Sequence, residues 1–113
     1  MDDVPFIFTY PNFFPLSPAG APELIQVDGH LCICFFTDAD NVRRFQTAQH
    51  GEKFAVWTAR AIVSESRERL LSNMKTLRPD LDEQGVTHVA IDPLPGPRKK
   101  IIYTSLDEFT AEV

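Results

Sequence analysis

The pair Asp28-Gly29 lies between two apolar runs in the stretch ELIQVDGHLCICFF, and it constrains the fold more than any other feature of the sequence. Both central positions of a two-residue hairpin favour positive φ, which Asp-Gly tolerates well. We therefore expect residues 23–27 to pair antiparallel with residues 30–36. The second strand carries apolar side chains on both of its faces, which predicts a central strand that is covered on both sides.

The rest of the chain alternates helix and strand patterns. We expect helices over residues 38–49 and 105–113, and strands over residues 53–58, 86–92 and 100–104. The first helix should bury Val42, Phe45 and Ala48, because they recur at a spacing of three. Gly51 should end it.

A longer helix should begin at Ser64 or Ser66 and bury Leu70, Met74 and Leu77. Pro79 should break it, with one further turn ending at Gly85. Strands separated by helices require crossovers, whereas Asp-Gly and Pro-Gly turns favour hairpins. The chain of 113 residues is thus predicted to be one α/β (α+β-like) domain, a mixed sheet of about five to six strands with three helices packed on it.

The first 22 residues are rich in Phe and Pro. Aromatic residues at every second position of residues 6–10 predict a strand. Residues 11–22 contain four prolines and should form a long loop rather than a helix or central strand. Four phenylalanines fall in this start, at Phe6, Phe8, Phe13 and Phe14. Exposed apolar patches mark partner sites, so these four are the candidate partner-binding residues.

The formal net charge of −5 disfavours nucleic acid as a partner, because phosphate binding needs a basic face. The one basic cluster, Arg98, Lys99 and Lys100, is either a solvated turn or a weak anion contact. The start is acidic where a secretory signal would be positive, and the longest apolar run is far too short to span a bilayer. We expect a cytoplasmic protein without membrane contact.

The Asp-x-Asp that follows the apolar strand has two interpretations. Asp38 and Asp40, together with Asp92 at the end of a later strand, could bind a metal ion and a phosphoryl group. Alternatively, Thr37 caps a helix with Asp40 at its third position. The same pattern recurs at Thr104 and Asp107, so we favour capping. We predict no metal site and no catalytic residue.

Cys32 and Cys34 alternate on one strand, where their Cα atoms would lie at or beyond the limit for a disulfide. A zinc site would need further ligands, of which His30 and His88 are the conceivable ones. Both cysteines are predicted to be buried apolar residues, and His88 to be a strand residue with satisfied hydrogen bonds. No cofactor is expected.

Residues 35–40 (FFTDAD), the aromatic Phe45 and the later HVAIDP resemble the SseB N-terminal domain family over residues 30–113. Family members typically have Asn-Pro where this chain has Asp92-Pro93. The resemblance implies a bacterial cytoplasmic α/β domain with no established enzymatic mechanism, and it transfers no catalytic residue.

Two functional hypotheses follow. The first is a non-catalytic interaction or regulatory domain that self-associates, for example as a homodimer, through its aromatic start. The second is a small metal-dependent phosphate-binding protein or phosphatase-like enzyme that uses Asp38, Asp40 and Asp92.

Overall fold

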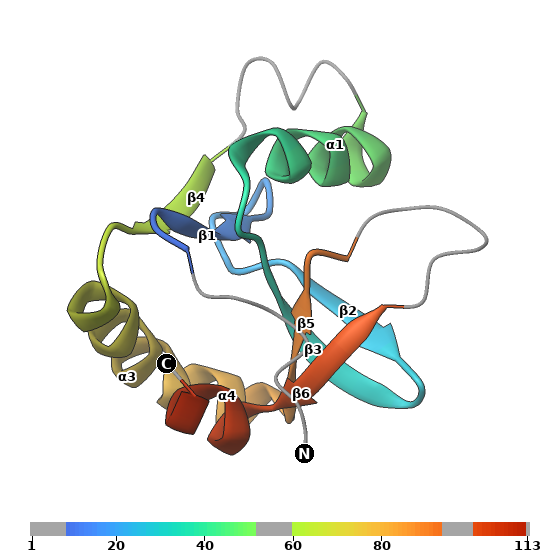
Figure 1. Cartoon of the computed structure of the whole chain (residues 1–113). Coiled ribbons are helices and arrows are strands. Elements are labelled where there is room, and N and C mark those ends of the chain that lie inside the picture. The colour runs from blue at the N-terminus through green and yellow to red at the C-terminus, as the bar shows by residue number, and fades with distance from the viewer. Residues whose placement is uncertain (1–8, 52–59, 94–100, 113) are drawn as a thin grey trace.

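A computed structural model describes residues 9–51, 60–93 and 101–112 (Figure 1). Its strands are β1 (Asn12–Leu16), β2 (Leu24–Val27), β3 (His30–Phe35), β4 (Arg60–Ser64), β5 (His88–Ile91) and β6 (Ile102–Ser105). Its helices are α1 (Ala39–His50), α3 (Arg67–Gln84) and α4 (Leu106–Glu112). A four-stranded sheet has the order β2-β3-β5-β6, and β1 pairs with β4 in a two-stranded sheet. The predicted mixed α/β fold is confirmed.

The Asp-Gly hairpin is present as predicted. Asp28 and Gly29 have φ angles of 51° and 82°, and Val27 pairs with His30 across the turn. These are the positive φ values that a two-residue hairpin of this kind requires. The turn fixes the register of β2 on β3, and that register decides which side chains of β3 face each layer.

Strand β3 is central and buried on both faces, as predicted. It pairs antiparallel with β2 and parallel with β5. Ile33 and Phe35 pack with residues of α3 and α4, including Leu70 and Phe109. The opposite face contributes its side chains to two smaller clusters, one of them with α1. Figure 1 shows α1 at one end of the molecule and α3 and α4 at the other.

The prediction of a loop over residues 11–22 is wrong for its first half. Residues 12–16 form β1, in which Pro15 lies opposite Ala61 of β4. Proline has no backbone N–H to donate to a neighbouring strand. Prolines in sheets are therefore confined to edge strands, strand starts and bulges, and β1 is an edge strand of its two-stranded sheet. Phe13 ties this pair to the larger sheet, because its N–H and C=O both bond to Phe36 at 2.8 Å.

Strand β4 was missed from the sequence, and it decides between the two predicted starts of the long helix in favour of Ser66. Ser64 is the last residue of β4 and accepts a hydrogen bond from Asn73 at 2.9 Å, whereas Ser66 caps α3 by accepting the N–H of Arg69. The strand expected at residues 53–58 lies outside the described residues.

Pro79 does not break α3, contrary to the prediction. The helix runs from Arg67 to Gln84 with Pro79 inside it, and it ends at Gly85 in the left-handed conformation, as predicted. Leu81 lies beyond the proline and is buried in the main core, so packing holds the last turns of the helix in place. Tertiary burial here outweighs the loss of one backbone N–H.

Helix α1 matches its predicted extent to one residue at each end. Val42 and Phe45 are buried, as expected, but Ala48 is exposed. Gln46 is buried instead, because its amide group bonds to backbone carbonyls of β1 and β4. Among the described helices none is long and apolar enough to cross a membrane.

Candidate functional site

The ends of β3 and β5 meet, because the two strands are parallel neighbours. Asp92 follows β5 with a positive φ of 47°, and its N–H bonds to the carbonyl of Phe35 at 2.7 Å. Its carboxylate accepts the backbone N–H of Thr37 at 3.0 Å and the hydroxyl of Thr37 at 2.9 Å. Both oxygens of Asp92 therefore hold the segment that joins β3 to α1.

The predicted cap of α1 is displaced by one residue. The N-cap is Asp38, whose Oδ1 accepts the N–H of Asp40 at 2.7 Å, and not Thr37. The hydroxyl of Thr37 is engaged with Asp92, so the next oxygen-bearing side chain takes the position at the helix start.

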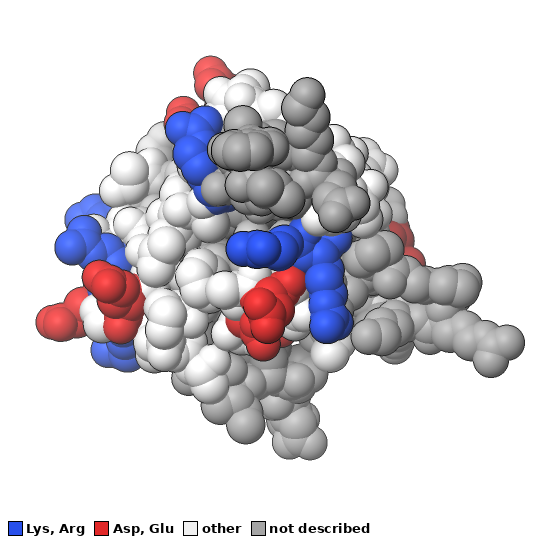
Figure 2. Space-filling model, turned by 90° about the horizontal axis from the view of Figure 1, so that it is seen from above, with Lys and Arg blue, Asp and Glu red and all other residues white. Residues whose placement is uncertain are grey.

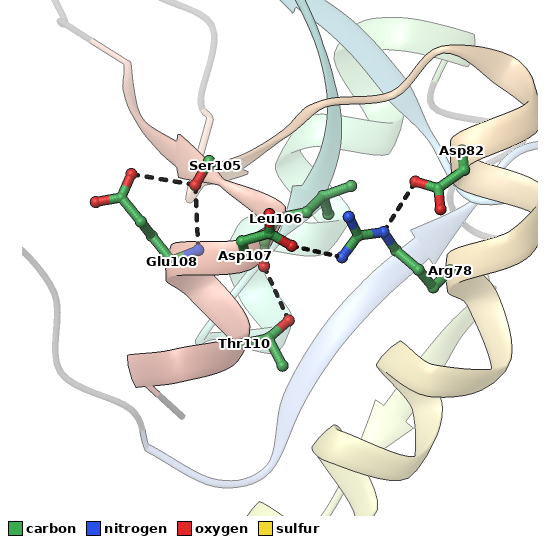
Figure 3. Close-up of polar contacts among 7 residues, drawn as sticks. All are labelled: Arg78, Asp82, Ser105, Leu106, Asp107, Glu108 and Thr110. Carbon is green, nitrogen blue, oxygen red and sulfur yellow. Dashed lines mark hydrogen bonds and ion pairs between the residues drawn. The ribbon is translucent and has the colours of Figure 1, made fainter.

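The same displacement occurs at α4. Ser105, rather than Thr104, accepts the N–H of Glu108 at 3.1 Å, and its hydroxyl donates to the Glu108 carboxylate at 3.1 Å (Figure 3). The Ser-x-x-Glu spacing is that of a capping box, but the Glu108 carboxylate accepts the hydroxyl of Ser105 and not its backbone N–H. Asp107, the predicted partner of Thr104, bonds to Arg78 instead.

The three carboxylates of the metal hypothesis do not form a metal-binding group. Asp38 and Asp40 are exposed at the helix start, and both oxygens of Asp92 are bonded to Thr37. Within residues 9–51, 60–93 and 101–112, no group of three His, Cys, Asp or Glu side chains could hold a metal ion. The parallel strands do bring Asp92 beside the Asp38 segment, as that hypothesis required, but the bonds formed there are structural.

The cysteines are buried and unpaired, as predicted. Cys32 and Cys34 are free thiols with no exposed surface. Burial raises the pKa of Cys34 far above its usual range, and the nearby carboxylate of Glu23 adds to this effect. Burial also raises the pKa of Cys32. A thiol with a raised pKa is a poor nucleophile and a poor metal ligand.

Two histidines come together in a way that sequence reasoning did not predict. His30 and His88 begin β3 and β5, and their ring centroids are 4.0 Å apart. Tyr103 of β6 lies 5.5 Å from each ring. The signal was present in the sequence only as two histidines at the starts of two strands, and the parallel register of those strands was needed to pair them.

The aromatic start is core rather than surface wherever it is described. Phe14, a predicted partner-binding residue, has no exposed surface and packs 5.3 Å from Phe35. Phe13 is partly buried against the cluster of Cys34, Phe36, Val42 and Phe45. Phe6 and Phe8 lie outside the described residues, as do Arg98, Lys99 and Lys100 of the predicted anion contact.

Arg78 links α3 to α4. Its Nε donates to Asp82 at 2.8 Å and its Nη1 lies 3.1 Å from Asp107 (Figure 3). The hydrogen bond to Asp82 is the main reason that the pKa of Arg78 is raised. The spacing of Arg78 and Asp82 is visible in the sequence as an i,i+4 pair, whereas Asp107 could be found only from the fold.

A groove of about 780 Å³ lies beside this contact. Its lining consists of Leu71, Met74, Lys75, Arg78, Pro79, Asp82 and Thr110. The size is typical of ligand pockets, but the guanidinium at the groove is already bonded to two carboxylates. The fold therefore uses its charges to hold two helices together. On the face shown in Figure 2, basic and acidic side chains likewise lie beside one another.

Two large apolar side chains are exposed among the described residues. Val63 on β4 is 44% exposed and Ile102 on β6 is 38% exposed. Strand β6 stands at the end of the order β2-β3-β5-β6 and pairs with β5 on one side. Ile102 thus lies on a strand whose other side has no partner strand within the described part of the chain.

No protein-family model matches the chain, and no curated protein matches its sequence. The resemblance to the SseB N-terminal domain family therefore stays a prediction from the motifs quoted above.

Proposed function

We propose that this chain is a non-catalytic interaction domain that self-associates through the edge strand β6. The observation that carries the proposal is the exposed Ile102 on an edge strand that pairs with β5 alone among the described strands. This replaces the aromatic start as the basis for self-association, because Phe14 lies in the core.

Strand β6 has few of the features by which proteins protect a sheet edge. Natural edges carry charged residues, prolines or bulges that block pairing with another chain. The residues of β6 are Ile102, Tyr103, Thr104 and Ser105, which include no charge and no proline. The opposite edge strand, β2, is equally free of charge, but none of its large apolar side chains is exposed to the degree of Ile102.

A second copy of the same strand is a suitable partner for β6. Antiparallel pairing about a two-fold axis would set Ile102 opposite Ser105 of the copy and Tyr103 opposite Thr104 of the copy. Such an arrangement closes at a dimer, because the two-fold axis makes each copy contribute the same strand, β6, to one shared contact. The strand is short, so we expect weak association with a dissociation constant on the order of micromolar.

The residues that suggested enzymatic chemistry support a non-catalytic function by the bonds they make. Asp92 holds Thr37, Asp38 caps α1, and the cysteines are buried. A regulatory function, membership of the SseB-like family and a cytoplasmic location are part of this proposal and rest on the sequence patterns.

Sedimentation velocity over a wide range of protein concentration tests the proposal. We expect a concentration-dependent dimer that Ile102→Lys weakens at least tenfold, because a charged side chain on an edge opposes pairing. Val63→Lys is the matched control, since it places the same charge on the other exposed apolar position. A monomer at every concentration would overturn self-association, and equal effects of the two substitutions would overturn the assignment to β6.

A further inference from the structure

The pair of imidazole rings on β3 and β5 is placed to respond to acid. His30 and His88 are both half-buried, and their rings lie 4.0 Å apart with 34° between their planes. Tyr103 packs against both rings and meets His88 at 74°, edge to face. The pair therefore supports a side chain of β6, the strand proposed above as the self-association edge.

Several groups surround the pair among the described residues. Thr87 Oγ1 lies 2.7 Å from Nδ1 of His88, and the hydroxyl of Tyr103 donates to Asp28 at 3.1 Å. The thiol of Cys32 lies 3.5 Å from the carbonyl of His30. The negative charge of Glu108 on α4 favours the charged form of His88 and acts to raise its pKa.

Two protonated rings at this separation repel each other strongly, because they share a half-buried site. One proton can be accommodated, since the second ring stays neutral. Burial, followed by the neighbouring His30, lowers the pKa of His88, and the opposing effect of Glu108 is smaller. The ring of His88 therefore binds its proton more weakly in the folded chain than in the unfolded chain.

We propose that the His30–His88 pair is an acid-sensitive contact that controls how firmly β6 is held in the sheet and, through β6, the self-association of the chain. Neutral rings pack against each other and support Tyr103. A second proton forces the rings apart and removes the contacts of Tyr103 with both rings. The inference rests on the proposed function, because it takes β6 as the edge that pairs with a second copy.

The direction of the pH effect follows from proton binding. A base that binds protons more weakly when folded stabilises the fold fully above its unfolded pKa, and this stabilisation is lost as the pH falls below that value. For an imidazole, the pH range in which this stabilisation is lost begins at about pH 6.5 and extends downward. We therefore expect both the fold and the dimer to weaken as the pH falls through this window.

The experiment is made in a His50→Gln background. The chain has three histidines, and His50 contacts Glu23 away from the pair, so this substitution leaves His30 and His88 as the only imidazoles. Sedimentation and urea unfolding are measured at about pH 7.5 and about pH 5.5. The comparison is the same chain with His88→Gln, in which one ring of the pair cannot bind a proton.

For the His50→Gln chain, we expect the dissociation constant of the dimer to rise at least tenfold and the urea midpoint to fall at the lower pH. When His88→Gln is added, we expect the fold-change in the dissociation constant and the shift of the urea midpoint each to be less than half as large. A monomer at both pH values would overturn the proposed function and the pH control of self-association together. A dimer whose pH response is the same with and without His88 would overturn the acid-sensitive contact alone.

Discussion

Asp92 bonds to Thr37 with both oxygens of its carboxylate, one to the backbone N–H at 3.0 Å and one to the hydroxyl at 2.9 Å. The two residues are 55 positions apart in the sequence and close the junction where β3 and β5 end. This contact explains why an Asp follows β5 and why Thr37 does not cap α1.

A double-mutant cycle measures this contact. We expect Thr37→Val and Asp92→Asn each to lower the free energy of unfolding, by about 1 to 2 kcal/mol, because hydrogen bonds to a charged acceptor are stronger than neutral ones. Asparagine tolerates the left-handed conformation of position 92, so backbone strain does not enter the comparison. Urea unfolding of the four proteins is the measurement. Losses that simply add in the double mutant would show that the two side chains are not coupled.

Magnesium should leave the stability of the chain unchanged. Asp92 has no oxygen free of Thr37, and Asp38 and Asp40 lie exposed at a helix start. A ligand that binds only the folded state raises the melting temperature. We therefore expect equal melting temperatures with and without millimolar Mg²⁺, in the natural chain and in Asp40→Asn. A rise that Asp40→Asn removes would restore the metal hypothesis.

The sequence predicted those turns, helix ends and helix faces that depend on the conformational preferences of neighbouring residues. The Asp28-Gly29 turn and the end of α3 at Gly85 needed only the φ preferences of a few residues. In the buried stripe of α1, periodicity was sufficient for Val42 and Phe45, but not for Ala48, which is exposed, or Gln46, which is buried. The features that were predicted correctly are encoded within about a dozen residues, and the sequence was sufficient for them.

Contacts between distant segments were not predictable in this way. Nothing near Pro15 shows that residues 12–16 pair with β4, because the partner strand lies more than 40 positions away. The capping positions differed for the same reason, since Thr37 is engaged by Asp92. The candidate site at β6 depends on strand order, which the turns and helices of the sequence did not determine.

Replacement of Pro79 should stabilise the chain. A proline inside a helix removes one backbone hydrogen bond and crowds the preceding turn, yet α3 continues through it. We expect Pro79→Ala to raise the free energy of unfolding by about 1 to 3 kcal/mol, after allowance for the greater freedom of the unfolded chain. Glu83→Ala, at another exposed position of the helix, is the control and should change stability by less than about 0.5 kcal/mol. An unchanged or lower stability in Pro79→Ala would mean that the helix has adapted to the proline.

The two thiols should react only when the chain unfolds. Cys32 and Cys34 have no exposed surface, and burial raises the pKa of each thiol. Because the thiolate is the reactive form, we expect iodoacetamide at neutral pH to modify neither cysteine in the folded chain and both in urea. Mass spectrometry of the labelled protein gives the result. Rapid labelling of the folded chain would show that the sheet opens at β3.

Gln46 should be essential for the packing of α1 on the two-stranded sheet. Its Nε2 donates to the carbonyl of Leu16 at 2.9 Å and to the carbonyl of Arg60 at 3.1 Å, and these two residues are paired across β1 and β4. The side chain has no exposed surface. Leucine is similar in size but cannot donate, so Gln46→Leu leaves two carbonyls without this partner. We expect a loss of about 2 to 3 kcal/mol in the free energy of unfolding, larger than any gain from an added apolar side chain.

The exposed Gln49 on the same helix supplies the control for this substitution. Gln49→Leu changes the same chemical group in solvent and should alter stability by less than about 0.5 kcal/mol. Equal effects of the two substitutions would mean that the carbonyls of Leu16 and Arg60 find other donors when Gln46 is removed. A large loss for Gln46→Leu alone would establish that one buried amide joins α1 to both strands of the pair. The hydrophobic periodicity of the helix could not reveal this, because it counts Gln46 as a surface residue.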